Sequence, residues 1–132
     1  MTGEVRITIA SEIDATRAVL QVDRFSQDAG FAQTPSRMIA TAVSELAQNI
    51  LRYAGSGEIR VRVVERCGGR GVEIEALDEG PGIADPDRAL EDHYSTGGTL
   101  GLGLPGVRRL MDEFDLDTRC GRGTRVTARK WL

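Results

Sequence analysis

The sequence predicts an α/β fold, a two-layer sandwich in which a mainly antiparallel, mixed sheet carries about three helices on one face. Segments that alternate apolar and polar residues, as half-buried strands do, occur at the start, in the middle and at the end of the chain. Between them lie segments whose apolar residues recur at helical spacing. No repeat or low-complexity segment interrupts the 132 residues, so we expect a single domain over residues 1–132.

The N-terminal segment predicts a strand followed by a helix. Residues 4–10 alternate in the manner of a strand with one buried face. Ser11 or Asp14 can cap the helix that follows, and Gly30 is a suitable stop.

A short linker containing Pro35 then leads to a second predicted helix, over residues 36–53. At about 100° per residue, Glu45 and Asn49 fall together on one edge of its apolar stripe. Their side chains are therefore expected one turn apart, beside the core rather than opposite it.

The middle of the chain predicts an antiparallel hairpin. Residues 59–64 and 72–76 alternate, with a turn predicted over residues 67–71. One face of the hairpin would be buried and the other charged, with arginines and glutamates paired across the strands. Asp78 would lie at the end of the second strand.

The last part of the chain predicts a helix and a second hairpin. Apolar residues at helical spacing run from Val107 to Phe114, and Pro105 suits the first turn, where a missing N–H does no harm. The hairpin would occupy residues 115–132, around the turn at residues 121–123.

Composition excludes several classes of protein. Hydrophobic residues make up 40% and charged residues 28%, which is typical of a folded globular chain, and the net charge of -3 gives no basic surface for nucleic acid. No apolar run reaches the ~18 residues of a membrane span, and the N-terminus does not resemble a signal peptide, so we expect a cytoplasmic protein without membrane partners. Cys67 and Cys120 lack a metal-type spacing and are expected as reduced thiols.

A glycine-rich stretch, residues 77–104, is the strongest indication of a ligand site. Residues 101–106 match the dinucleotide pattern GxGxxG, but no apolar strand precedes them and no acid lies about 20 residues on, which argues against a Rossmann site. The Walker A pattern is absent. Glycines that open a helix can still direct backbone N–H groups toward phosphates.

Two smaller motifs each allow two interpretations. Asp78, followed by Gly80 and Gly82, is either a plain strand-ending turn or an acceptor for an exocyclic amine such as that of adenine. Glu45 and Asn49 form either a solvated helix edge or a general base beside a Mg²⁺ ligand. Neither motif alone decides between its two interpretations.

In combination, four motifs point to one family. They are Glu-x-x-x-Asn on a helix, Asp-x-Gly-x-Gly after a strand, a glycine-rich stretch opening a helix, and Gly123-Thr124 in a late strand. The chain thereby resembles the GHKL ATPases and kinases, whose ATP site in the Bergerat fold lies between helices and sheet. Within that superfamily, residues 44–59, 78–114 and 121–131 are similar to small bacterial serine kinases related to anti-sigma factors, most of all to the switch kinases of stressosomes.

The resemblance implies a role for each motif residue. Glu45 would be the catalytic base that activates a serine hydroxyl, and Asn49 would bind Mg²⁺ on the phosphates of ATP. Asp78 would bind the adenine amino group, helped by Thr124 through a shared water. Residues 84–96 would form a short lid over the ATP. The remaining ATP-binding residues would be Gly80 and Gly82 around adenine, Gly97, Gly98, Leu100, Gly101 and Gly103 along the triphosphate, and Leu102 and Leu104 beneath it.

The resemblance also implies partners. STAS-domain antagonist and scaffold proteins would be the substrates, and the released kinase would activate a PP2C-type phosphatase. A kinase that binds a sigma factor is the first alternative, although Tyr53 replaces the histidine that many anti-sigma kinases carry there. The second alternative is a binding module without catalysis. A homodimer is compatible with each of these three functions. His93, in the lid segment, is expected to be a surface residue rather than a phosphate contact.

Overall fold

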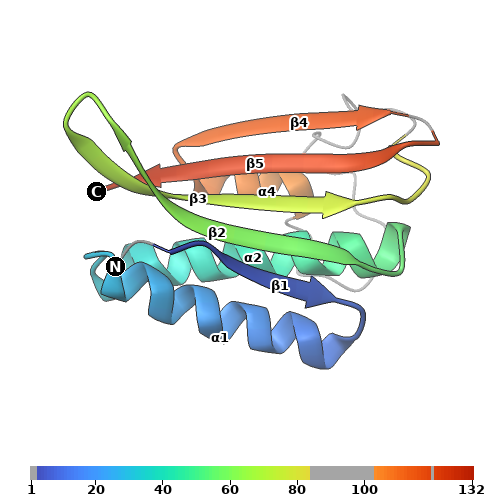
Figure 1. Cartoon of the computed structure of the whole chain (residues 1–132), viewed down its shortest axis with the longest axis horizontal. Helices are drawn as coiled ribbons and strands as arrows, with labels where there is room; N and C mark the ends of the chain where they lie inside the picture. Colours follow the sequence, from blue (N-terminus) through green and yellow to red (C-terminus); the bar gives the residue numbers. More distant parts are fainter. Residues whose placement is uncertain (1–2, 84–102, 120) are drawn as a thin grey trace.

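The computed structural model describes residues 3–83, 103–119 and 121–132. Within them, five strands form one sheet in the order β1-β2-β3-β5-β4, and the helices cover one of its faces (Figure 1). The predicted fold class is confirmed, and every strand pairing among the described residues is antiparallel. The elements are β1 (Val5–Ile9), α1 (Glu12–Asp28), α2 (Gln33–Tyr53), β2 (Gly57–Arg66), β3 (Gly69–Asp78), α4 (Gly103–Leu110), β4 (Glu113–Arg119) and β5 (Gly123–Trp131).

Both predicted caps act at the start of α1. Ser11 Oγ accepts a hydrogen bond from Asp14 N at 3.3 Å, and Asp14 Oδ2 accepts one from Ala10 N at 2.9 Å. Side chains thus satisfy the N–H group of Asp14 in the first turn and that of Ala10, which precedes the cap. The helix ends before Gly30, which has a φ of +114°, as predicted for the stop.

The second helix begins earlier than predicted. α2 starts at Gln33, so Pro35 lies in the first turn of the helix and not in a linker. Proline is tolerated there because the first-turn N–H groups have no partner within the helix. Ser36 then ties the helix to α1, since its hydroxyl donates to Asp23 Oδ1 at 2.6 Å.

Two further boundaries differ from the prediction. The turn between β2 and β3 has two residues, Cys67 and Gly68, instead of five, because both adopt positive φ (52° and 78°) and so close a tight hairpin. Phe114 was assigned to the last helix and lies in β4 instead. α4 ends at Leu110, and Phe114 contributes its side chain to the core from the sheet.

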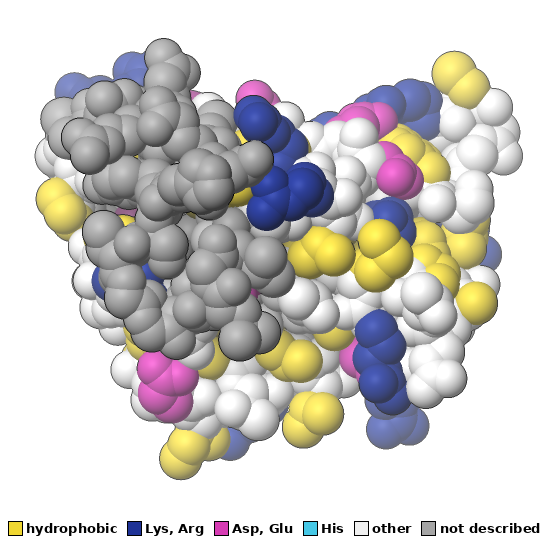
Figure 2. Space-filling model, turned by 180° about the vertical axis from the view of Figure 1, so that it is seen from behind, with side chains coloured by type: hydrophobic (Ala, Val, Ile, Leu, Met, Phe, Trp, Pro, Cys, Tyr) yellow, Lys and Arg dark blue, Asp and Glu magenta, His cyan; other side chains and the backbone are white. Residues whose placement is uncertain are grey.

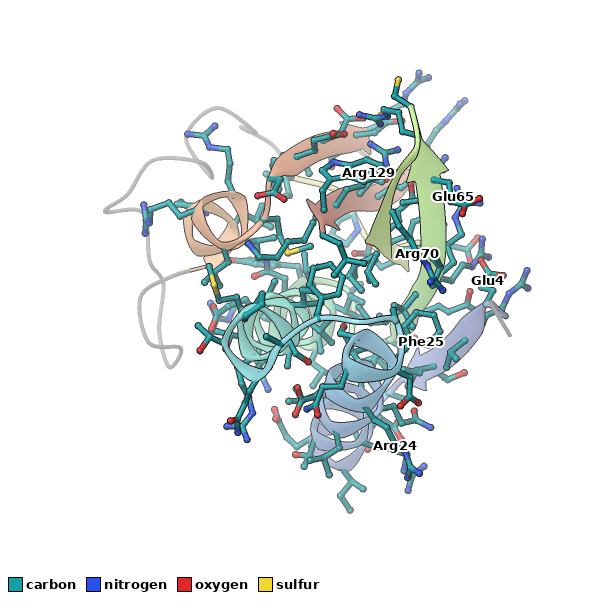
Figure 3. All side chains as sticks on the ribbon, turned by 90° about the vertical axis from the view of Figure 1, so that its left-hand side faces the viewer. Glu4, Arg24, Phe25, Glu65, Arg70 and Arg129 are labelled. Atoms are coloured by element: carbon teal, nitrogen blue, oxygen red, sulfur yellow. The ribbon has the colours of Figure 1, made fainter. Side chains whose placement is uncertain are left out.

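The core lies between the helices and the inner face of the sheet. Ile59 and Val61 of β2 and Ile74 of β3 are fully buried there, in one hydrophobic cluster with Val43 and other apolar residues of α2. Figure 3, seen along the strands, shows Phe25 of α1 directed toward the sheet and Arg24 directed away from it. From the helical side, apolar side chains are dispersed among polar ones (Figure 2). None of the described helices has the length and hydropathy to cross a bilayer.

The opposite face of the sheet carries the predicted ladder of charges. Glu73 is 5% exposed and accepts hydrogen bonds from Arg62 Nε at 2.8 Å and Arg129 Nε at 2.7 Å. Burial by itself raises the pKa of Glu73, but the two hydrogen bonds and the arginine charges outweigh it and hold the pKa below 4.5. Glu73 therefore joins β2, β3 and β5 most strongly in its ionised form.

This arrangement predicts an acid-dependent loss of stability. Because the folded pKa of Glu73 lies below the unfolded one, its contribution is complete above about pH 4.5 and is lost as the pH falls through the folded pKa. Glu73→Gln is expected to lower the free energy of unfolding by about 2 kcal/mol at pH 7. Urea unfolding between pH 7 and pH 3 measures this, and the deficit should shrink with acid. A constant deficit at every pH, or an equal loss for the exposed control Glu65→Gln, would contradict it.

Candidate functional site

A small cavity lies between α2, the start of α4 and the inner face of the sheet. It has a volume of about 20 Å³. Four predicted site residues line it together: Asn49, Asp78, Leu104 and Thr124. A purine is larger than this cavity. The other lining residues are Leu46, Ile50, Tyr53, Ala76, Ile83 and Val126.

A second, larger hollow of about 650 Å³ opens at the same end of the sheet. Its walls include charged residues of the outer face, such as Arg60 and Arg125. Asp78 and Thr124 line both hollows, whereas Asn49 lines only the small one. We therefore place the candidate site in the small cavity, where helix and sheet residues meet.

Strand alternation explains why Asp78 faces the cavity. Ile74 and Ala76 of β3 point into the core, and Asp78 continues that face at the strand end. Thr124 is its register partner on β5. Asp78 Oδ1 accepts a hydrogen bond from Gly80 N at 3.0 Å, and Oδ2 has no hydrogen-bond partner among the described residues. That second oxygen can accept from a ligand N–H group.

Two glycines allow the close approach of the turns around Asp78. A Cβ added to Gly80 would lie 2.6 Å from Ala54 Cβ, so this turn packs directly on the end of α2. Gly123 has a φ of +96°, and a Cβ there would lie 2.1 Å from Asp78 O. Only glycine fits at position 123, because both the backbone angle and the contact exclude a side chain.

Glu45 and Asn49 lie where the helical pattern placed them, but in different surroundings. Glu45 is 6% exposed, so the interpretation as a solvated helix edge fails for it. Its Oε1 accepts a hydrogen bond from Gly103 N at 2.9 Å and so caps the N-terminus of α4. Asn49 is half-buried, and its amide makes no hydrogen bond within the described part of the chain.

Thr118, which the sequence did not single out, contacts two of the residues that line the cavity. Thr118 of β4 lies opposite Thr124, with 2.9 Å between the two hydroxyl oxygens. It also accepts a hydrogen bond from Ile83 N at 2.8 Å. The alternation of β4 indicates that Thr118 faces inward with Phe114 and Leu116, but it does not indicate which residues Thr118 contacts. A Cβ on Gly57 would lie 2.4 Å from Leu77 O, which the sequence also did not indicate.

Several predicted residues lie outside the described residues. These are the lid segment 84–96 with His93, and Gly97, Gly98, Leu100, Gly101 and Leu102. Gly103 and Leu104 are described and form the first turn of α4. Gly82 is described and has a φ of +80°. The described residues contain no group of three or more His, Cys, Asp or Glu side chains suited to a metal ion.

Sequence comparisons give a consistent family. Residues 34–132 match the family model described as histidine kinase-, DNA gyrase B-, and HSP90-like ATPase. The serine/threonine-protein kinase RsbT of Bacillus subtilis (strain 168) is 44% identical over 132 residues, which cover 100% of this chain and 99% of that protein. An anti-sigma F factor of Thermoanaerobacter sp. (strain X514) is 30% identical over 98 residues, which cover 71% of this chain and 68% of that protein.

Among solved structures, the chain is similar to the mycobacterial sensor histidine kinase MprB, with a TM-score of 0.56. The match covers 99% of this chain and 97% of that one at 20% sequence identity. This likeness supports the fold alone.

Proposed function

The chain belongs to the family of histidine kinase-, DNA gyrase B- and HSP90-like ATPases, and from that premise we propose that it phosphorylates serine on STAS-domain proteins of a stressosome-like complex. Its enzyme class is serine/threonine-protein kinase, using ATP, given 44% identity along its whole length to RsbT. The observation that carries the proposal is the meeting of Asn49 with Asp78 and Thr124 at one cavity, with Glu45 one helical turn away. We take residues 1–132 as one GHKL kinase domain.

In the proposed site, the role of each residue follows from the part of ATP that it would contact. Asp78 accepts the adenine amino group, and Thr124 supports the same edge of the base through a shared water. Gly80 and Gly82 shape the turn around adenine, and the start of α4 at Gly103 and Leu104 lies along the phosphates, where the positive end of a helix dipole favours anions. Gly97, Gly98, Leu100, Gly101 and Leu102 would complete that phosphate wall.

Glu45 is the proposed general base, which accepts the proton of the substrate serine hydroxyl as the γ-phosphoryl group is transferred in line. Asn49 would hold Mg²⁺ together with phosphate oxygens. Its amide oxygen, without a hydrogen-bond partner among the described residues, fits a set of hard oxygen ligands. When bound, the ion neutralises charge on the phosphates.

The proposed partners follow from the same relatives. STAS-domain antagonist and scaffold proteins are the substrates, and the released kinase binds and activates a PP2C-type phosphatase. Binding of a sigma factor is the second candidate, supported by 30% identity to an anti-sigma F factor. The identity to RsbT is higher and extends along the whole chain. We prefer the phosphatase partner because the sequence motifs resemble those of the stressosome switch kinases.

A reconstituted assay tests the proposal. The purified chain with Mg-ATP is expected to phosphorylate a serine of a STAS protein from the same genome, and EDTA should abolish the transfer. A pull-down with the phosphatase and with a sigma factor then separates the two candidates. If the chain binds a STAS protein without transferring phosphate to any, it is a non-catalytic binding module and the proposed kinase activity is wrong.

A further inference from the structure

β4 (Glu113–Arg119) is an edge strand of the sheet (Figure 1). It pairs with β5 on one side, and no described strand pairs with its other side. In an antiparallel pair, the backbone groups of alternate residues point away from the neighbouring strand. The outer edge of β4 therefore presents a row of N–H and C=O groups with which a further strand can pair.

The two edges of the sheet differ in how well their inward side chains are covered. At the opposite edge, Ile7 and Ile9 of β1 are 6% and 0% exposed, and α1 packs against that strand. Phe114 and Leu116 of β4 also pack against the core, but they are only partly buried. The inward face is thus fully covered at the β1 edge and only partly covered at the β4 edge.

The outward side chains of β4 supply two carboxylates without donors. Asp115 and Asp117 are exposed and make no hydrogen bond or ion pair with any other described residue. Glutamates of the same face each accept a hydrogen bond from an arginine: Glu58, Glu73, Glu75 and Glu113. The two aspartates border a hollow of about 240 Å³, in which Arg62 and Arg129 are held by Glu73. Because these arginines are already engaged, the aspartates can accept from a basic side chain that enters the hollow.

We propose that the β4 edge binds an extended segment of a partner protein in which basic and apolar residues alternate. Directly opposite residues of paired strands lie on the same face of a sheet. Alternate basic residues of the segment therefore face Asp115 and Asp117. The apolar residues between them cover Phe114 and Leu116. Main-chain hydrogen bonds to β4 supply affinity, and the alternation of side chains supplies specificity.

A second copy of the chain does not fit this edge. Pairing two β4 strands about Leu116 would place Asp115 of one copy opposite Asp117 of the other, and like charges directly opposite each other are destabilising. The inference does not depend on the nucleotide site, so the test is made without nucleotide.

The test measures binding of labelled synthetic peptides to the full chain by fluorescence polarisation. The first peptide is Arg-Val-Arg-Val-Arg-Val, and its control, Arg-Arg-Arg-Val-Val-Val, has the same composition and charge. Only the alternating order places all arginines on one face of a strand, so the first peptide is expected to bind at least about tenfold more tightly. Equal affinities would show that charge alone attracts the peptides, and the inference would be wrong.

Two variants test the carboxylates. The double variant Asp115→Asn with Asp117→Asn is expected to weaken binding of the alternating peptide about tenfold. The control, Glu65→Gln with Asp28→Asn, removes two exposed carboxylates outside β4 and should bind as the wild type does. If both double variants weaken binding equally, the peptide responds to net charge and the proposed edge site is wrong.

Methylation of the peptide backbone tests whether a strand is added. In an antiparallel pair, either the arginine or the valine N–H groups of the alternating peptide point at β4. N-methylation of one set should therefore abolish binding, and N-methylation of the other set should leave it nearly unchanged. Loss with both peptides, or with neither, would overturn the inference. Saturating peptide should also slow amide exchange in β4, whereas slower exchange in β1 alone would show that the other edge is used.

Discussion

Asp78→Asn is expected to reduce ATP affinity at least about 100-fold while leaving the fold intact. The asparagine oxygen can still accept from Gly80 N, as Asp78 Oδ1 does at 3.0 Å, so the turn keeps its hydrogen bond. The amide NH₂ then replaces Oδ2 and directs a donor at a ligand amine. The ligand amine then loses its acceptor and also faces a second donor. Both changes weaken binding, so replacing the carboxylate by an uncharged group of the same shape has a large effect.

Equilibrium binding of Mg-ATP measures this loss, and thermal unfolding checks the fold. Asp115→Asn is the matched control, since it makes the same chemical change on an exposed residue of the outer face of β4. Binding within a few-fold of the wild type in Asp78→Asn would show that the base is held elsewhere. The proposed adenine site would then be wrong even if kinase activity is found.

Glu45→Gln is expected to lower the rate of phosphoryl transfer by about 10²- to 10⁴-fold, with ATP affinity nearly unchanged. The glutamine Oε1 can accept the hydrogen bond that Gly103 N now gives to Glu45 at 2.9 Å, so the cap of α4 is kept and only the base is removed. Glu45→Ala is the less informative variant, because it also removes the cap, at a cost of about 1 kcal/mol. Transfer of labelled phosphate to a STAS serine under saturating ATP is the measurement.

The exposed Glu65→Gln on β2 serves as the control for the loss of one carboxylate. Normal turnover in Glu45→Gln would rule out Glu45 as the base. A loss of ATP binding in the same variant would instead assign Glu45 to the nucleotide site itself. The two failures are distinguishable because binding and transfer are measured separately.

Much of the fold could be predicted because its patterns are local. Strand alternation and helical spacing give the elements and the charged face, and Arg62 does face Glu73 in the register of β2 and β3. The similarity to GHKL kinases could be predicted because four motifs occur in order, and it was confirmed by comparison. Boundaries were wrong where two rules compete. Phe114 fits a helical stripe as well as a strand, and the two-residue turn at Cys67 and Gly68 depends on positive φ at a non-glycine residue.

The site could be predicted in its residue types but not in its contacts. The spacing places Glu45 beside the core, yet nothing in the sequence indicates that it caps α4, because Gly103 is distant in the chain. Thr118 was missed for a similar reason. Its contacts depend on the register of the last hairpin and on the position of Ile83 beside that hairpin. Both are tertiary features. A single hydrogen bond between distant segments produces no periodic pattern in the sequence.

In the proposed mechanism, the N-terminal cap of α4 and proton transfer use the same carboxylate, that of Glu45. While Glu45 Oε1 accepts from the Gly103 N–H group, that oxygen is a weaker base toward a substrate hydroxyl. Any acceptor that takes over the Gly103 N–H releases the oxygen, and by linkage a free carboxylate favours whatever replaces it at the helix start. In that mechanism, binding of a ligand at the first turn of α4 and the basicity of Glu45 would be coupled through one hydrogen bond. Amide exchange at Gly103, compared between Glu45→Gln and Glu45→Ala, would report that coupling, and equal exchange rates would show that it does not exist.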